Sequence, residues 1–312
     1  MENKGLNIFN SKLVLASPET ATDDDYARIE AVIAHEYFHN WTGNRITCRD
    51  WFQLCLKEGL TVFRDQQFSG DMRGAAVKRI EDVALLRARQ FREDQGPLAH
   101  PVRPESFVEI NNFYTATIYE KGAEVIGMLK RLVGDAGYAK ALDLYFDRHD
   151  GDAATIEDWL KVFEDATGRD LTQFKRWYSQ AGTPRLKVTD DWKDGTYTLH
   201  FEQENPPTPG QPVKEPKVLP IAVGLLNPNG DEVVPTTMLE MTEARQSFRF
   251  DGLAARPVPS ILRGFSAPVV LDRKASAQDQ AFLLAHDTDP FNKWEAGRAL
   301  ARGMLAAMIT DG

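Results

Sequence analysis

The sequence lacks several features that would direct it to particular classes of protein. It holds only two cysteines, Cys48 and Cys55, whereas secreted domains often carry more. Their spacing does not match a cysteine zinc knuckle, and we expect two reduced structural thiols rather than a disulfide. The opening residues, MENKGL, have neither a basic stretch nor an apolar segment, so no signal peptide is visible. These absences predict a cytoplasmic protein.

Positive charge and long apolar runs are also scarce. Lys and Arg total 37 against 46 Asp and Glu, and the resulting net charge of −9 disfavours binding to phosphate backbones. No apolar run approaches the roughly 18 residues that are needed to cross a bilayer. The longest local candidate, 218–226, is interrupted by Pro220 and Gly224. We therefore expect no nucleic-acid partner and no membrane association, and the composition leaves the oligomeric state open.

The pattern of residues changes twice along the 312-residue chain, which is longer than one hydrophobic core usually serves. After a β-like opening near 8–15, the chain to residue 182 is predominantly helical in pattern. From Leu186 to about Leu271 the alternation is typical of strands, with a proline-rich loop over 206–216, which predicts a small β-sandwich. From Ala277 to Met308 about two more helices fit. We predict a multidomain α+β protein with domains 1–182, 183–275 and 276–312.

The helical part divides into segments at capping and breaking residues. We expect helices over 22–43, 51–63, 75–93, 117–132, 138–148, 156–166 and 171–180. The first should begin after Thr22, where three aspartates favour a helix N-terminus, and end at a left-handed Gly43. Apolar residues occupy most sides of this first helix, which predicts that it is central and buried.

The most informative residues lie in that first helix, in the string His35-Glu36-x-x-His39. On a helix, residues four apart lie within roughly 40° of each other, so the two imidazoles can hold one metal ion. Glu36 projects roughly 60° from His39, close enough to reach a metal-bound water without binding the metal. The string alone arises by chance, but in a buried helix these side chains would be costly without a metal.

A catalytic zinc site usually has a third protein ligand, and Glu58 is the candidate. It lies on the next predicted helix, and a turn at 43–44 would let that helix fold back and bring Glu58 to the histidines. The alternative is an ordinary solvated glutamate. Asp65 lies on nearly the same helix face and either binds the free ring nitrogen of a histidine or is a plain surface aspartate. The remaining histidines have no partner at ligand spacing and are expected to be structural or solvated: His100, His149, His200 and His286.

Four stretches together resemble one known family. The run 35–65 resembles the gluzincin zinc aminopeptidases, and in particular the bacterial aminopeptidase N type. Residues 1–5 (MENKG) are similar to the end of the family's Gly-Ala-Met-Glu-Asn motif, and residues 112–124 (NFYT to YEKGAE) to its catalytic tyrosine segment. Residues 177–184 (WYSQAGTP) resemble the close of its catalytic domain. The resemblance covers essentially the whole chain and implies a thermolysin-like, mostly helical catalytic domain.

The resemblance also implies a role for each site residue. His35, His39 and Glu58 would bind one Zn²⁺ per chain, and Glu36 would act as the general base on a zinc-bound water. Tyr119 would stabilise the oxyanion; without the motif it would be assigned to the helix core. Glu2 would bind the free α-ammonium of a peptide substrate, which separates an aminopeptidase from an endopeptidase.

The chain also departs from the family pattern. It starts inside a motif, so the strands and N-terminal domain expected before Met1, with a second amine-binding glutamate, are missing from this sequence. The helical domain expected at the other end is reduced to its first helices. The sequence therefore predicts an internal fragment of a zinc aminopeptidase that acts on peptides with a free N-terminus. Two alternatives are a thermolysin-like endopeptidase, disfavoured by Glu2 and the Tyr119 segment, and a truncated zinc-binding fragment with little or no activity.

Overall fold

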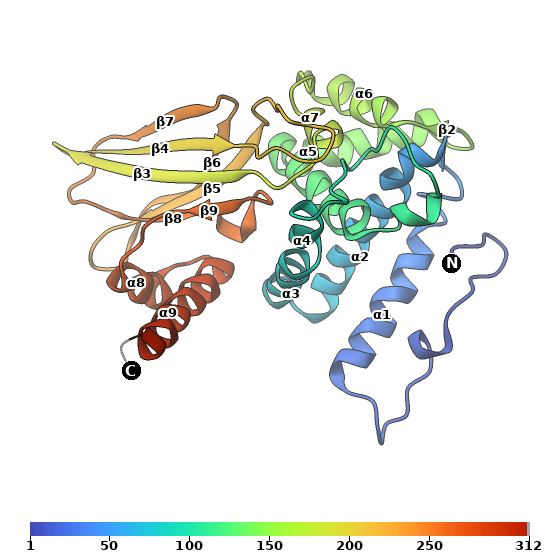
Figure 1. Cartoon of the computed structure of the whole chain (residues 1–312), viewed down its shortest axis with the longest axis horizontal. Coiled ribbons are helices and arrows are strands. Elements are labelled where there is room, and N and C mark those ends of the chain that lie inside the picture. The colour runs from blue at the N-terminus through green and yellow to red at the C-terminus, as the bar shows by residue number, and fades with distance from the viewer. Residues whose placement is uncertain (311–312) are drawn as a thin grey trace. The chain divides into compact units, whose positions relative to one another are not determined.

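The computed structural model describes residues 1–310 and divides into two compact units, which are described one by one (Figure 1). Unit 1 comprises residues 1–182 and 208–211, and unit 2 comprises 183–207 and the residues from 212 onward. Among residues 1–310, no helix combines the length and apolar character required to span a membrane. The division into three domains expected from the sequence stays a prediction.

Unit 1 is built almost entirely of helices. Its α-helices are α1 (Asp23–Phe38), α2 (Leu54–Arg73), α3 (Ala75–Ala88), α4 (Gln90–Asp94), α5 (Gly122–His149), α6 (Ile156–Thr167) and α7 (Arg176–Ser179). Short 3₁₀ turns lie at Ser11–Leu13, Trp51–Gln53 and Ile110–Phe113, and a π-helical turn, η4 (Thr117–Lys121), precedes α5. Two-residue strands β1 (Thr47–Cys48) and β2 (Ala153–Ala154) pair in parallel.

The core of unit 1 lies where α2, α5 and α6 pack together. Val125, Met128 and Leu129 of α5 are fully buried, as are Trp159 and Phe163 of α6. The rings of Trp159 and Phe163 lie 4.7 Å apart. Helix α2 packs between α1 and α5, so its residues can reach side chains from both neighbours. This arrangement makes α2 the central helix of the candidate site.

Several helix boundaries differ from the sequence-based prediction. The expected opening strand is wrong, since residues 8–15 hold a 3₁₀ turn. Helix α2 continues ten residues past Phe63 to Arg73, and the helix expected over 75–93 breaks at Arg89. The helices expected over 117–132 and 138–148 join in α5, which is kinked at Gly134 because this residue adopts φ 73°. Only a short α7 forms within 171–180.

Helix α1 begins as predicted and ends earlier than predicted. Thr22 caps it in a reciprocal capping box with Asp25, but the helix stops at Phe38 and not at Gly43. The prediction that α1 is buried is also wrong. Tyr26, Ile33 and Tyr37 are 40%, 47% and 56% exposed, because α1 packs mainly on α2 and otherwise contacts the short 3₁₀ turn at Ser11–Leu13. The packed flank is the one that carries the histidines.

Unit 2 contains two sheets followed by two helices. The first sheet has the order β7-β4-β3-β9 and is built from β3 (Arg185–Lys193), β4 (Thr196–Glu204), β7 (Arg245–Phe250) and β9 (Val270–Asp272). The second has the order β6-β5-β8, from β5 (Leu219–Leu226), β6 (Glu232–Met241) and β8 (Val258–Ile261). Alternate residues of β4 are buried, and β5 is buried throughout, as a sandwich requires. Helices α8 (Ala277–His286) and α9 (Pro290–Thr310) follow, as the sequence predicts.

Candidate metal centre and active site

The two histidines of the motif come from the end of α1, and the glutamate comes from α2. His35 lies in the last turn of α1, and His39 is its C-cap residue with helical backbone angles, so the four-residue spacing still places both imidazoles on one side. After His39 the chain turns through Gly43, which adopts φ +132° and donates its N–H to the Ile46 carbonyl at 2.8 Å. This reversal brings α2 back against α1 and carries Glu58 to the histidines, as the sequence predicts.

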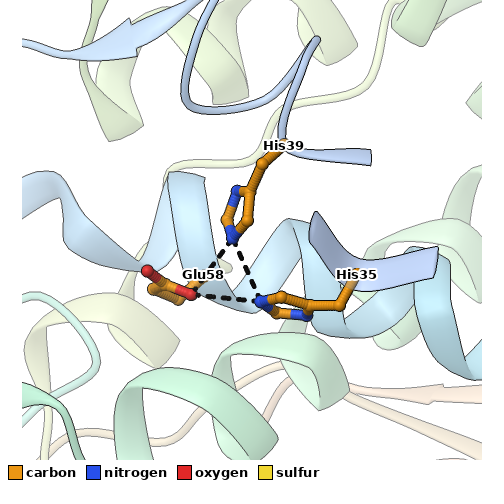
Figure 2. A group of neighbouring side chains, drawn as sticks. All are labelled: His35, His39 and Glu58. Carbon is orange, nitrogen blue, oxygen red and sulfur yellow. Dashed lines mark hydrogen bonds and ion pairs between the residues drawn. The ribbon is translucent and has the colours of Figure 1, made fainter. Parts of the chain in front are cut away.

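The three side chains converge on one point (Figure 2). The Nε2 atoms of His35 and His39 lie 3.0 Å apart, and Oε2 of Glu58 lies 3.5 and 3.4 Å from them respectively. Donor atoms that each lie about 2.0–2.2 Å from a tetrahedral zinc ion are separated by roughly 3.3–3.5 Å. The two distances to Glu58 fall in that range and the Nε2–Nε2 distance lies slightly below it, so the three atoms are spaced closely enough to hold a single metal ion. The same three residues form a group able to hold a metal.

The other ring nitrogen of each histidine is already engaged. Nδ1 of His39 lies 2.8 Å from the Thr42 carbonyl oxygen, which can only accept, so that Nδ1 carries a proton. Nδ1 of His35 lies 2.7 Å from Oδ2 of Asp65, which indicates the same tautomer. With both imidazoles neutral, the two Nε2 atoms would present lone pairs to each other and to a carboxylate. Such a cluster is stable only with a cation at its centre, which is the arrangement that a metal ion would satisfy.

Burial and charge reinforce that requirement for a cation. His39 is 1% exposed, and the Glu58 side chain is almost as inaccessible. Burial raises the pKa of Glu58, but the histidines and Lys57 outweigh it and hold that pKa below its usual value. Burial lowers the pKa of His35, but Asp65 and Glu58 outweigh it and raise the pKa to about 9. The cluster thus favours positive charge in the form of a proton or a metal.

Lys57 is a site residue that the sequence reasoning missed. Its ammonium pairs with Oε1 of Glu2 and lies 3.2 Å from Oε1 of Glu58. Burial raises the pKa of Glu2, but the hydrogen bond from Lys57 outweighs this and lowers it. Glu58 therefore offers one oxygen to the histidines and the other to Lys57. The one sequence feature that could have drawn attention to Lys57 is its position directly before Glu58. The burial of that helix was not predicted.

Glu36 lies beside the cluster without joining it. Its Oε1 lies 2.8 Å from the amino group of Met1, and Glu36 forms with Glu2 and His39 a second group of converging donor atoms that shares His39 with the first. Within residues 1–310 its buried Oε2 has no hydrogen-bond partner. A buried carboxylate oxygen next to a metal-shaped cluster is available to a water held there. This geometry agrees with a group that handles protons and does not bind the metal.

Tyr119 reaches the same cluster from η4. Its ring lies 6.5 Å from the His35 ring at an interplanar angle of 11°. Burial, followed by the negative charge of Glu58, raises the pKa of Tyr119 well above its usual value. The phenol therefore keeps its proton and acts as a hydrogen-bond donor near the cluster. The structure thus brings together all six residues singled out from the sequence: Glu2, His35, Glu36, His39, Glu58 and Tyr119.

With this geometry established, comparisons with known proteins place the chain in a family. Residues 1–178 match the family described as "Peptidase family M1 domain". Residues 182–274 match a domain of unknown function with an Ig-like fold, DUF3458, and residues 277–312 match its C-terminal companion described as ARM repeats. The chain belongs to peptidase family M1, a family of metallopeptidases.

Individual relatives agree with this membership. The chain is 60% identical over 307 residues to aminopeptidase N of Caulobacter vibrioides and 53% identical over 310 residues to aminopeptidase N of Escherichia coli. These matches cover 98% and 96% of the chain but only 36% of each relative. Among solved structures, aminopeptidase A of Legionella pneumophila in complex with aspartic acid matches with a TM-score of 0.87 and 35% identity. That match covers 99% of this chain and 34% of the other.

Proposed function

We propose that the chain carries the zinc-binding catalytic part of an aminopeptidase, which removes single residues from the N-termini of peptides. The observation that carries the proposal is the convergence of the His35, His39 and Glu58 donor atoms at 3.0–3.5 Å, with both Nδ1 atoms engaged elsewhere. Of the metals that prefer imidazole and carboxylate ligands in a three-donor open site, zinc is the one that serves hydrolysis most often. Family membership and the aminopeptidase N relatives support the same proposal.

The proposed chemistry assigns a step to each residue around the cluster. Zinc bound there would supply a Lewis acid and lower the pKa of a bound water to about 7. Glu36, whose Oε2 is unpartnered among residues 1–310, takes the proton of the attacking water and later passes it to the leaving amine. Tyr119, which keeps its phenolic proton, donates a hydrogen bond to the oxyanion of the tetrahedral intermediate.

Glu2 is proposed to select for a free N-terminus. Ligand atoms of Glu2, Glu36 and His39 all lie within 4.8 Å of one another, so an α-ammonium bound by Glu2 would be held next to the metal ligands. In the structure Lys57 pairs with Glu2, and a substrate ammonium would compete with Lys57 for that oxygen. An endopeptidase cleaves within a chain and binds no free α-ammonium beside its metal ligands. A carboxylate for that ammonium therefore disfavours the thermolysin-like alternative.

A second proposal is a zinc-binding segment with little or no turnover by itself. The observation that favours it is the share of the relatives that the chain represents, because 36% of their length leaves most of their residues outside it. The exposed apolar residues of α1 fit the same alternative, since exposed apolar surface promotes association.

Zinc content and turnover measured on the same sample separate these proposals. We expect elemental analysis to find one zinc per chain and a chromogenic alanyl anilide to be hydrolysed. Zinc without hydrolysis would support the inactive segment, and cleavage of an N-terminally blocked peptide would support the endopeptidase. A chain that binds no zinc under any loading condition would contradict all three.

A further inference from the structure

The turn that carries Tyr119 is a single π-helical turn, η4, immediately before α5. Such turns insert one more residue per turn than an α-helix and occur often at functional sites. They are rare within helices, so we expect them to persist where surrounding contacts hold them in place. The contacts around η4 therefore decide where the Tyr119 hydroxyl lies relative to the metal ligands.

On one side, η4 and the start of α5 touch α2 backbone to backbone. A side-chain Cβ placed on Gly59 would lie 3.0 Å from Cα of Gly122 and 3.1 Å from the Ile118 carbonyl oxygen. A Cβ on Gly122 would lie 3.1 Å from Cα of Gly59. All three distances are shorter than the usual contacts of a Cβ atom, and the neighbouring atoms belong to the backbone and cannot rotate away. The two glycines thus set the closest approach between the Glu58 segment and the Tyr119 segment.

On the opposite side, two consecutive carboxylates at the end of α4 hold both ends of η4. Glu93 accepts hydrogen bonds from the backbone N–H of Ala116 at 3.1 Å and of Thr117 at 2.9 Å. It also accepts from the Thr117 hydroxyl at 2.8 Å. Asp94 accepts from the ammonium of Lys121 at 2.8 Å, and Lys121 also donates to the Gly182 carbonyl at 2.9 Å.

We infer that the Gly59–Gly122 contact and the Glu93–Asp94 pair act together as positioning elements that set the distance from the Tyr119 hydroxyl to the metal ligands. The inference rests on the proposed function, in which Tyr119 donates to the oxyanion. The glycines allow the backbones of η4 and α2 to lie in direct contact. The carboxylates prevent η4 from rotating or relaxing into a regular α-helical turn. None of these four residues is assigned a contact with substrate.

The buried ion pair argues for a geometric role beyond packing. The side chains of Lys121 and Asp94 are each 1% exposed, and burying such a pair often adds no stability over an apolar pair of similar volume. The pair does fix the position of Lys121, because its ammonium donates both to Asp94 of α4 and to the Gly182 carbonyl. Its sequence position, two residues after Tyr119, transmits that constraint to the phenol.

The test compares Gly122→Ala and Glu93→Gln with a matched control, Gly127→Ala. Gly127 lies one turn further along α5, and a Cβ there would meet only the flexible end of Arg131 at 3.1 Å and the Phe63 ring at 3.5 Å. Each protein is labelled with 3-fluorotyrosine, and the Tyr119 resonance in the ¹⁹F spectrum is assigned with Tyr119→Phe. Zinc affinity, kcat and KM on an alanyl anilide are measured in parallel.

We expect the Tyr119 resonance to move in Gly122→Ala and Glu93→Gln and to stay in place in Gly127→Ala. Zinc affinity should stay within about 2-fold, whereas kcat should fall about 10-fold with little change in KM, because a displacement of about 1 Å costs up to roughly 10²-fold. An unmoved Tyr119 resonance in both test variants would overturn the inference. So would an equal loss of zinc affinity and kcat, which would indicate general damage to packing.

The two proposals fail in different ways. If the unsubstituted chain bound no zinc or hydrolysed nothing, the proposed function would fail while the ¹⁹F comparison, made on metal-free protein, still reported whether these contacts position Tyr119. If the unsubstituted chain were active but the resonance and kcat were insensitive to both substitutions, only the positioning role would fail. Glu93→Gln keeps one acceptor oxygen, so it remains informative if Gly122→Ala does not fold.

Discussion

Two histidine sites of the described residues, one in each unit, differ in character, and the site in unit 1 has the arrangement of a metal site. In unit 1, the Nε2 atoms of His35 and His39 face each other and Glu58 at 3.0–3.5 Å. In unit 2, His200 lies on the face of a sheet with Nδ1 2.7 Å from the Ser247 hydroxyl and Nε2 2.9 Å from an Asp191 oxygen. Residue types alone do not distinguish the two sites, because an Asp-His-Ser set suggests a functional site as readily as a His-Glu-His set does.

Burial and the direction of the lone pairs make the difference. His39 is 1% exposed, whereas the side chains of His200 and Asp191 are 39% and 80% exposed. Both ring nitrogens of His200 are engaged by neighbouring strands and water can reach all three groups, so no cation is required there. In unit 1 the outer nitrogens are engaged and the inner lone pairs converge, so a cation is required. Convergence of buried acceptors is therefore the informative feature.

The largest expected effect is loss of the metal. His39→Ala removes a buried donor, so zinc affinity should fall by more than the 10–100-fold that loss of an outer partner typically costs. His200→Ala is the matched control and should leave zinc stoichiometry unchanged. Elemental analysis after dialysis checks both. If His39→Ala retained stoichiometric zinc, the two clusters would not differ in the way described here.

The next effect separates metal binding from chemistry. Glu36→Gln should retain one zinc per chain, because Glu36 is not among the three converging donors, while turnover should fall about 10³-fold for lack of a general base. Turnover of an alanyl anilide and zinc content are measured on the same preparation. Normal kcat in this variant would assign the base to another residue.

A smaller effect is expected at Tyr119. Tyr119→Phe removes the hydroxyl and keeps the ring against His35, so kcat should fall about 10²-fold with little change in KM. Steady-state kinetics decide the outcome. A higher KM at constant kcat would make Tyr119 a residue that binds the ground state of the substrate.

The smallest effect tests the partner of His35. Asp65→Ala leaves all three donors in place but removes the acceptor of the His35 Nδ1 proton, so zinc affinity should fall about 10–100-fold. A chelator competition assay measures this loss. Unchanged zinc affinity would show that Asp65 does not support His35. That is the alternative of a plain aspartate that the sequence left open.

The sequence predicted local features most reliably. Thr22 caps α1, the chain reverses near Gly43, and a 3₁₀ turn begins after Asp50 and leads into α2 at Leu54. Two helices, α8 and α9, follow the sheets as expected, because each of these features depends on caps, turns and periodicity within a few residues. The exposed flank of α1 was predicted wrongly, since an apolar pattern shows what a helix can bury and not what packs on it. The roles of the site residues and the cytoplasmic location stay predictions.

The sequence by itself determined the pairing of the two histidines, because residues four apart on a helix lie on one side of it. It offered Glu58 as the third donor, but the reversal at Gly43 and the packing of α2 on α1 bring that residue to the histidines. Only the tertiary structure decided what surrounds those donors. The contact of Lys57 with Glu2 and that of the Glu93 carboxylate with η4 join separate elements. No periodicity encodes such contacts, since they depend on how closely helices approach, and at Gly59 that approach is set by a missing side chain.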